Sequence, residues 1–347
     1  MPAEVLGQPI LTPNSLLLRF KGSDELTIAS LEKKRSQFYT THGLKIVNVR
    51  EEPGAVAISI ERSPRQIIQL GSVWKHWNPA PSAHGNTKLL VAVKESDSSP
   101  LFLDPLTQSP HTLIAGTSGS GKSVLLQNIL LAIAATNSPS LTQVVLIDPK
   151  HGVDYGPLGE MPHIQGGIIT NLDDALGAIQ GLVQEMENRY PLLNKAGVNH
   201  VRLYNQKMPD KLPYIWLIHD EFADWMQDEH YRDEVVALVN RLGMKARAAG
   251  IFLIFAAQRP SVEVMPMQLR DNLDNRLILR VAQEGTSQFC LGEKGAENLL
   301  PHGQMLARLG GSQPVLCQVP YADLTELQTF VEVLMASQAA AAAPQAV

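Results

Sequence analysis

Hydrophobic positions in the longer, C-terminal part of the chain come in short runs that are almost continuously apolar. These runs are HTLIAG (111–116), QVVLID (143–148), YIWLIHDE (214–221), IFLIFAAQ (251–258) and RLILRV (276–281). Strands that are buried on both faces have this pattern, because helices cover both sides of a parallel sheet. The segments between the runs, such as 173–190 and 232–250, have the spacing of amphipathic helices. This alternation predicts an α/β fold with a mainly parallel sheet flanked by helices.

The first part of the chain has a different pattern, in which short apolar stretches alternate with polar residues. A short apolar run (15–20) predicts a strand, and the helical spacing that follows it stops at Gly43. Two alternating strands around the turn Pro53-Gly54 then predict a hairpin. Residues 10–70 therefore predict a small α/β unit in front of the main domain.

The stretch 78–86 is rich in Pro, Ser and Gly and has no periodicity, so we place a domain boundary there. We expect residues 1–85 to form the small α/β domain and its linker, and residues 86–334 to form the main domain. The Ala-rich segment 335–347 is of low complexity and predicts a disordered tail or linker.

Composition sets broad limits on function. With 347 residues, 44% hydrophobic and 18% charged, the chain is long enough for two well-cored domains. The net charge of -5 gives no overall basic character, so any contact with nucleic acid would need a local basic patch. Cys290 and Cys317 lie in apolar stretches, which favours buried, reduced thiols. With no signal peptide and no run long enough to span a bilayer, we expect a cytoplasmic chain.

The stretch GTSGSGKS fits the phosphate-binding pattern G-x-x-x-x-G-K-[ST] and lies between a predicted strand and a predicted helix. Backbone N–H groups of such a loop cradle phosphate oxygens, and glycines permit that backbone path. Lys122 is expected to reach the β- and γ-phosphates of ATP, and the Ser123 hydroxyl to bind Mg²⁺. The predicted ATP contacts are Gly116, Thr117, Ser118, Gly119, Ser120, Gly121, Lys122, Ser123 and Val124.

Polar residues end three of the predicted strands, at the edge of the sheet where ligands of open α/β sheets bind. Asp220 is expected to orient Mg²⁺, and Glu221 to polarise the attacking water for hydrolysis. Gln258 would place an amide beside the γ-phosphate. Asp148 is either a supporting acid or a turn cap.

Other classes of phosphate-loop protein are disfavoured by missing motifs. The guanine motif N-K-x-D is not present, because NKAG (194–197) lacks the aspartate. The transporter signature L-S-G-G-Q is not present either, since GGSQ (310–313) does not match it. A small-molecule kinase would need neither the N-terminal unit nor the long stretch after Glu221. These observations favour an ATPase of the motor type.

Several separated blocks together resemble the FtsK/SpoIIIE double-stranded DNA translocases. They are PHTLIAGTSGSGKS, LIDPKHGVDY, EMENRYPLLNKAGVNHVRLYN, YIWLIHDEFADWM, KARAAGIFLIFAAQRPSVEV and ENLLPHGQML, in the order and spacing of that family across residues 100–307. The resemblance implies a RecA-like motor domain that assembles as a homo-hexameric ring around duplex DNA and pumps it with ATP.

The resemblance also implies roles for individual residues. Lys122 and Ser123 would bind phosphate and Mg²⁺, with Asp220 at the metal, Glu221 at the water and Gln258 as sensor. A ring of this kind usually receives an arginine from the neighbouring subunit. Arg276 and Arg247 are the candidates, and an internally paired or solvated arginine is the open alternative for each. Arg259 and Arg270 flank a loop that would contact DNA phosphates if it faces the channel.

The sequence departs from the family pattern in three respects. We find neither the membrane-spanning N-terminal region nor the winged-helix domain that members usually have, and Gln288 replaces an arginine. The chain could therefore be a motor-only homologue or an excised motor. Two alternatives to a DNA translocase stay open: an ATP-switched assembly subunit of a DNA-processing, conjugation or anti-phage complex, and a protein-secretion ATPase.

Overall fold

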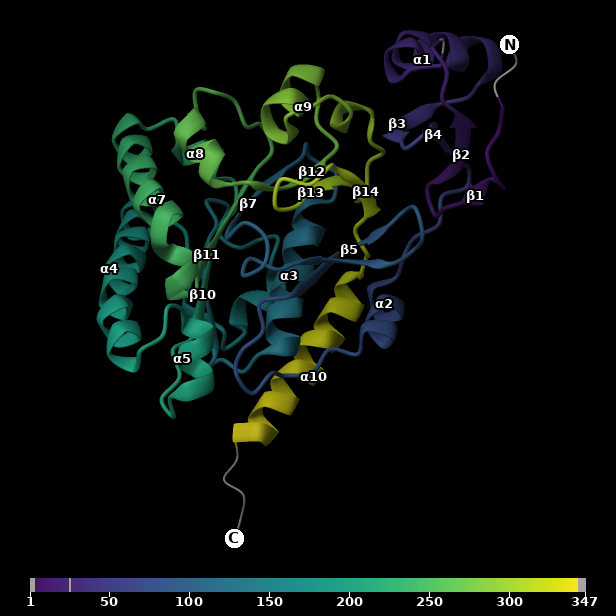
Figure 1. Ribbon diagram of the computed structural model, residues 1–347. Helices are drawn as coiled ribbons and strands as arrows, with labels where there is room; N and C mark the ends of the chain where they lie inside the picture. The colour runs from purple at the N-terminus through teal and green to yellow at the C-terminus, as the bar shows by residue number, and fades with distance from the viewer. Residues whose placement is uncertain (1–3, 25, 343–347) are drawn as a thin grey trace.

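The computed structural model describes residues 4–24 and 26–342, which fold around two separate β-sheets (Figure 1). The smaller sheet belongs to the N-terminal unit and is antiparallel, with the strand order β1-β2-β4-β3. Its elements are β1 (Ile10–Leu11), β2 (Ser15–Lys21), α1 (Ile28–His42), β3 (Ile46–Glu52) and β4 (Ala55–Glu61). Helix α1 covers one face of this sheet, where Leu31 packs against strand residues such as Val49 and Ile58.

Turn chemistry explains the boundaries in this unit. Helix α1 ends at Gly43, whose φ of 66° lies in the left-handed region that favours glycine. Strands β3 and β4 form the predicted hairpin around Pro53-Gly54, with Gly54 at a φ of 72°. The predicted strand, helix and hairpin are therefore all present in this unit.

The larger sheet has ten strands in the order β6-β5-β14-β13-β12-β7-β11-β10-β8-β9. The six strands from β12 to β9 are parallel: β12 (Asn275–Leu279), β7 (His111–Ala115), β11 (Ile251–Ala257), β10 (Tyr214–His219), β8 (Thr142–Ile147) and β9 (Ile164–Ile169). The remaining four are antiparallel: β5 (Leu89–Lys94), β6 (Pro100–Leu103), β13 (Gln304–Arg308) and β14 (Val315–Gln318). The predicted α/β fold with a mainly parallel sheet is confirmed, and the five apolar runs all lie in its parallel part.

Helices cover both faces of the large sheet, as the apolar runs require (Figure 1). Helices α4 (Leu172–Ala196) and α7 (Glu229–Ala249) enclose one hydrophobic cluster with the sheet. Helix α3 (Lys122–Thr136) lies in the second cluster, on the other face, with α2 (Leu70–Trp77) and α10 (Leu324–Ala342). The shorter helices are α5 (Val201–Lys207), α6 (Phe222–Trp225), α8 (Met267–Asn272) and α9 (Glu284–Leu291), with 3₁₀ turns at Gly156–Glu160 and Ala296–Asn298.

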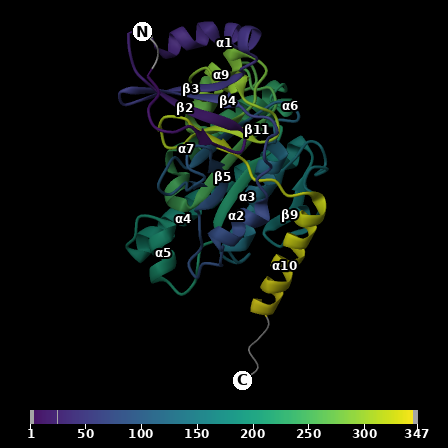
Figure 2. The same cartoon turned by 90° about the vertical axis from the view of Figure 1, so that its right-hand side faces the viewer.

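Helices α2 and α10 differ from the expected organisation. The rings of Trp74 and Phe330 lie 4.8 Å apart, so α2 packs on α10 and belongs to the main unit, although we expected residues 1–85 to form the separate domain (Figure 2). Helix α10 continues to Ala342. The expectation of a disordered tail is therefore wrong for residues 335–342, and residues 343–347 lie outside the described part.

Within residues 4–24 and 26–342, no helix combines the length and the apolar character that crossing a bilayer requires. Cys290 and Cys317 are buried free thiols, as expected.

Candidate nucleotide-binding site

The loop between β7 and α3 has a backbone that only glycine accommodates at three positions. Gly119 and Gly121 have φ values of 73° and 105°. A Cβ on Gly116 would lie 2.5 Å from Oγ of Ser120, and one on Gly121 would lie 2.7 Å from the backbone nitrogen of Gly303. Helix α3 begins directly after the loop, at Lys122. The loop therefore has the path that lets backbone N–H groups approach a phosphate at the start of a helix.

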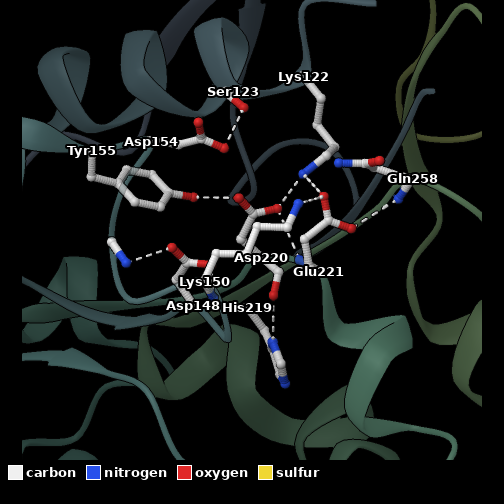
Figure 3. A network of polar contacts seen from close by, with 11 residues as sticks. Lys122, Ser123, Asp148, Lys150, Asp154, Tyr155, His219, Asp220, Glu221 and Gln258 are labelled. Atoms are coloured by element: carbon white, nitrogen blue, oxygen red, sulfur yellow. Dashed lines mark hydrogen bonds and ion pairs between the residues drawn. The ribbon is translucent and has the colours of Figure 1, made fainter. Parts of the chain in front are cut away.

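The acidic pair lies opposite this loop, where β10 ends (Figure 3). Asp220 and Glu221 are 1% and 3% exposed, and Lys122 bridges them. Its Nζ forms an ion pair with Oδ1 of Asp220 and lies 2.8 Å from Oε1 of Glu221. The Tyr155 hydroxyl donates a hydrogen bond of 2.8 Å to Oδ2 of Asp220. Residues 98 positions apart in sequence thus form one buried polar cluster.

The two carboxyl groups differ in their electrostatic surroundings. Burial alone would raise the pKa of Glu221, but the ammonium groups of Lys122 and Lys150 outweigh it and hold this pKa below its ordinary value. Burial raises the pKa of Asp220, and the Glu221 charge adds to this in spite of the Lys122 ion pair. Burial would lower the pKa of Lys122, yet the two acids raise it. Glu221 is therefore the carboxylate that is more readily ionised, as a group that activates water requires.

Glu221 is also held in a conformation that is rare for a residue with a side chain. Its φ of 45° lies in the left-handed region, at a cost of roughly 1–2 kcal/mol. Its Oε2 accepts a hydrogen bond of 3.2 Å from the backbone N–H of Gln258, at the end of β11. Strain of this kind persists where the surrounding structure fixes it, as it does at many functional sites.

Residues between β8 and the first 3₁₀ turn complete the cluster, and sequence reasoning missed most of them. Lys150 Nζ lies 3.0 Å from Oε1 of Glu221, and the Ser123 hydroxyl donates to Asp154 over 3.0 Å. Asp148 accepts the backbone N–H groups of Lys150 and Gly152, so its role as a turn cap is the one that the structure shows. Lys150, Asp154 and Tyr155 all lie in the block LIDPKHGVDY, whose resemblance to the family is the sequence signal that could have indicated them.

A cavity of about 980 Å³ adjoins this cluster. The phosphate loop, Lys150, Asp154 and Gln258 line one side of it. Further lining residues come from distant parts of the chain: Asn14, Arg65, Gln66, Ile67, Ile68, His302, Gly303, Gln318, Val319 and Tyr321. No local pattern marks these residues, because each lies far from the loop in sequence.

The residues present fit ATP and Mg²⁺. The loop glycines leave a cradle that a Cβ would fill, and Lys122 supplies the cation. The Ser123 hydroxyl and the Asp220 carboxylate are oxygen donors, which Mg²⁺ prefers. The described residues form no cluster of three or more His, Cys, Asp or Glu side chains that could hold a metal alone. Phosphate oxygens would therefore have to supply part of the coordination.

The four candidate arginines lie outside this cavity. Arg276 is 7% exposed and donates to the Cys290 carbonyl, so it is paired internally. Arg247 donates to the Leu106 carbonyl beside a different cavity, of about 440 Å³. Arg270 pairs with the adjacent Asp271 and lies over the Phe289 ring, while Arg259 is exposed at the end of β11.

Comparison with known proteins identifies the family. A profile of the FtsK/SpoIIIE family matches residues 77–262, more than half of the chain. The chain belongs to the FtsK/SpoIIIE family. The protein named DNA translocase FtsK from Campylobacter jejuni is 35% identical over 291 residues, which cover 82% of this chain and 30% of that protein. DNA translocase FtsK from Pseudomonas aeruginosa is 31% identical over 325 residues, which cover 85% of this chain and 39% of that protein.

This FtsK/SpoIIIE chain thus spans about a third of the length of the curated relatives it matches. Among solved structures, the pCW3 conjugation coupling protein TcpA with ATPγS is similar in fold, with a TM-score of 0.66 and 23% identity over 96% of this chain and 94% of that one. The cytoplasmic domain of the type VII secretion ATPase EccC from Thermomonospora curvata has a TM-score of 0.61 and 26% identity, over 72% and 31% of the two chains.

Proposed function

We propose that this chain is an ATP-hydrolysing motor that moves double-stranded DNA and works as a homo-hexameric ring. The observation that carries the proposed ATP hydrolysis is the buried cluster in which Lys122, Asp220 and Glu221 meet at the phosphate loop. This arrangement supplies a cation for phosphate, oxygen ligands for Mg²⁺ and an ionised carboxylate for water. A protein that only binds nucleotide would not need the last of these groups.

Different residues of this chain would bind the phosphates, bind Mg²⁺ and activate the water in ATP hydrolysis. Backbone N–H groups within residues 118–123 and the Nζ of Lys122 would hold the phosphates, since the N–H groups of Gly116 and Thr117 already donate to carbonyls elsewhere in the chain. Ser123 and Asp220 would hold Mg²⁺, which neutralises the charge on the β- and γ-phosphates. The Glu221 carboxylate accepts a proton from the attacking water, while Lys150 and the backbone of Gln258 fix its position.

The proposed DNA substrate is supported by the names of the relatives, since both curated relatives described above are named DNA translocases. Because the net charge is -5, contacts with DNA phosphates have to be local. Arg259 and Arg270 flank the segment proposed to make them, and binding of this kind weakens with salt and ignores base sequence. The buried free thiols of Cys290 and Cys317 fit a reducing, cytoplasmic location.

A second candidate function is favoured by one observation. EccC, named as a secretion ATPase, is similar to this chain at 26% identity. A motor for protein export would hydrolyse ATP at the same cluster, with turnover stimulated by a protein substrate. An ATP-switched assembly subunit would form complexes with little turnover on DNA.

The test is the ATPase rate measured against duplex DNA of increasing length, with electron microscopy of the same sample for rings. A translocase is expected to turn over faster on long duplexes than on short ones. Lys122→Ala should abolish ATP binding. Glu221→Gln should keep binding but lower kcat at least about a hundredfold, because an amide cannot accept the proton. A rate that no DNA changes would overturn the DNA motor and leave the two alternatives.

A further inference from the structure

Buried polar side chains join the N-terminal unit to the large sheet. At their centre is Glu95, which follows β5 and is 4% exposed. Its carboxylate accepts hydrogen bonds of 2.7–3.1 Å from side chains of the N-terminal unit and of β13: Thr12, Asn14, Ser15 and Gln304. No ion pair to Glu95 occurs within the described residues. This buried carboxylate, bonded only to neutral donors, therefore joins the N-terminal unit to the large sheet through several hydrogen bonds.

Asn14 extends this contact toward the nucleotide cavity, of which it is one of the lining residues. It is 1% exposed and uses both ends of its amide. Its Nδ2 donates to Oε1 of Glu95 at 2.8 Å and to Oε1 of Gln318 at 2.6 Å. Its Oδ1 accepts Nε of Arg65 at 2.9 Å, and Arg65 in turn donates to the Pro301 carbonyl at 2.8 Å. One side chain of the N-terminal unit therefore holds two residues that border the cavity.

Arg65 and Gln318 both donate hydrogen bonds to the loop Pro301–Gly303. Gln318 Nε2 donates to the His302 carbonyl over 2.8 Å, next to the bond from Arg65 to Pro301. His302 and Gly303 both have positive φ values, 64° and 96°. A Cβ on Gly303 would lie 2.7 Å from Nε2 of Gln318, so the loop and the amide are in close contact. The strained loop is held in place from the side of Asn14.

The same loop is bonded to the phosphate loop on its other side. The backbone N–H of His302 donates to the Gly119 carbonyl at 3.1 Å, and that of Gly303 donates to the Ser120 carbonyl at 2.6 Å. These bonds take up the two carbonyls, whose partial negative charge would repel a phosphate if they turned into the cavity. The hydrogen-bonded path is therefore Asn14 to Gln318 and Arg65, then loop 301–303, then the phosphate loop.

We propose that Asn14 is a positioning residue for nucleotide binding, which makes the N-terminal unit part of the ATP site. It acts through Gln318 and Arg65 and touches none of the reacting atoms. Because linkage is reciprocal, nucleotide binding should strengthen the hydrogen bonds of Asn14 to Gln318 and Arg65 as much as those bonds tighten nucleotide binding. The inference rests on the proposed ATP binding, and it holds whether or not the motor acts on DNA.

The experiment measures the Kd of a fluorescent ATP analogue, mant-ATP, without DNA, for wild type and variants of the full chain. Asn14→Ala is expected to weaken binding about tenfold, the value of a well-formed buried hydrogen-bond contact of about 1.4 kcal/mol. Ser15→Ala is the matched control, since among the described residues the Ser15 hydroxyl bonds only to Thr12 and Glu95, in the same interface. It leaves the bonds of Asn14 to Gln318 and Arg65 in place, so its Kd should stay within about twofold of wild type.

A double-mutant cycle separates positioning from general damage to the fold. If Asn14 acts through Gln318, the variant Asn14→Ala/Gln318→Ala should bind no more weakly than the weaker single variant. The inference would be overturned if the affinity loss of the double variant equals the product of the two single-variant losses. It would also be overturned if Asn14→Ala and Ser15→Ala have equal Kd values. If thermal melting shows that Asn14→Ala does not fold, Arg65→Met replaces it and has to show the same loss. Wild type that binds mant-ATP but ignores DNA refutes the proposed DNA motor alone.

Discussion

Replacing His111 by asparagine tests how the core of the large sheet responds to acid. His111 opens β7 and is completely buried. Its Nδ1 accepts the backbone N–H of Leu253 in β11 over 3.1 Å, so the ring is neutral with its proton on Nε2. Charging the ring would place a proton on Nδ1 and leave the Leu253 N–H without its acceptor. Burial accordingly lowers the pKa of His111 from 6.5 to about 4.

The sign and size of the effect follow from these two pKa values. Below pH 6.5 the unfolded chain binds a proton at His111, whereas the folded chain does not until the pH approaches 4. The free energy of unfolding therefore has its full value above pH 6.5 and falls as the pH drops toward 4. At pH 5 the loss from this residue alone is about 2 kcal/mol, because each full pH unit between the two pKa values is worth about 1.4 kcal/mol.

The assay is urea unfolding at pH 8 and pH 5, without nucleotide, followed by tryptophan fluorescence. All four tryptophans, at 74, 77, 216 and 225, lie in the main unit. Asparagine does not titrate, and its Oδ1 can accept the Leu253 N–H. At pH 8, His111→Asn should have a lower free energy of unfolding than wild type, because the asparagine side chain is smaller. At pH 5 this difference in the free energy of unfolding should shrink by about 2 kcal/mol. An identical gap at both pH values would refute the reasoning.

Three further predictions concern other parts of the molecule. Arg189→Met should lower the free energy of unfolding by about 3 kcal/mol in urea, because the buried guanidinium donates to the carbonyls of Pro213 and Ala249; a loss under 1 kcal/mol would contradict this. Gly303→Ala should weaken mant-ATP binding, since φ is 96° and the new Cβ would clash with Gln318; unchanged binding would show that the loop adapts. Lys150→Met removes a cation that lowers the pKa of Glu221, so the acid limb of the ATPase pH profile should move to higher pH; an unmoved limb would mean that Lys150 does not act on this carboxylate.

Local patterns were sufficient to predict the parallel strands and the chemistry at their ends. Lys122, Asp220 and Glu221 belong to motifs whose position at strand ends brings them to one edge of the sheet. The antiparallel strands β5, β6, β13 and β14 were not predicted, although β5 pairs with its neighbour β6 and β13 with its neighbour β14, because such short runs do not distinguish a strand from other buried segments.

Contacts that depend on tertiary packing escaped prediction because they join segments that are far apart in sequence. Asn14 and Gln318 are 304 positions apart, and neither belongs to a motif. Arg276 is the second residue of β12, and its guanidinium donates to the Cys290 carbonyl of α9 inside the chain. Helix α2 lies directly before the Pro-rich stretch where we placed the domain boundary, and its contacts with Phe330 and Phe102 assign it to the main unit.

The position of residues 65–77 limits how this chain can be divided into pieces. These residues line the nucleotide cavity, bridge to Tyr321 through paired backbone bonds, and then cover α10 with α2. A fragment cut at the Pro-rich stretch near residue 80 would keep every recognised ATPase motif, yet it would lose a wall of its own nucleotide cavity. The unit that can be transplanted into a chimaera is therefore larger than the one its motifs outline.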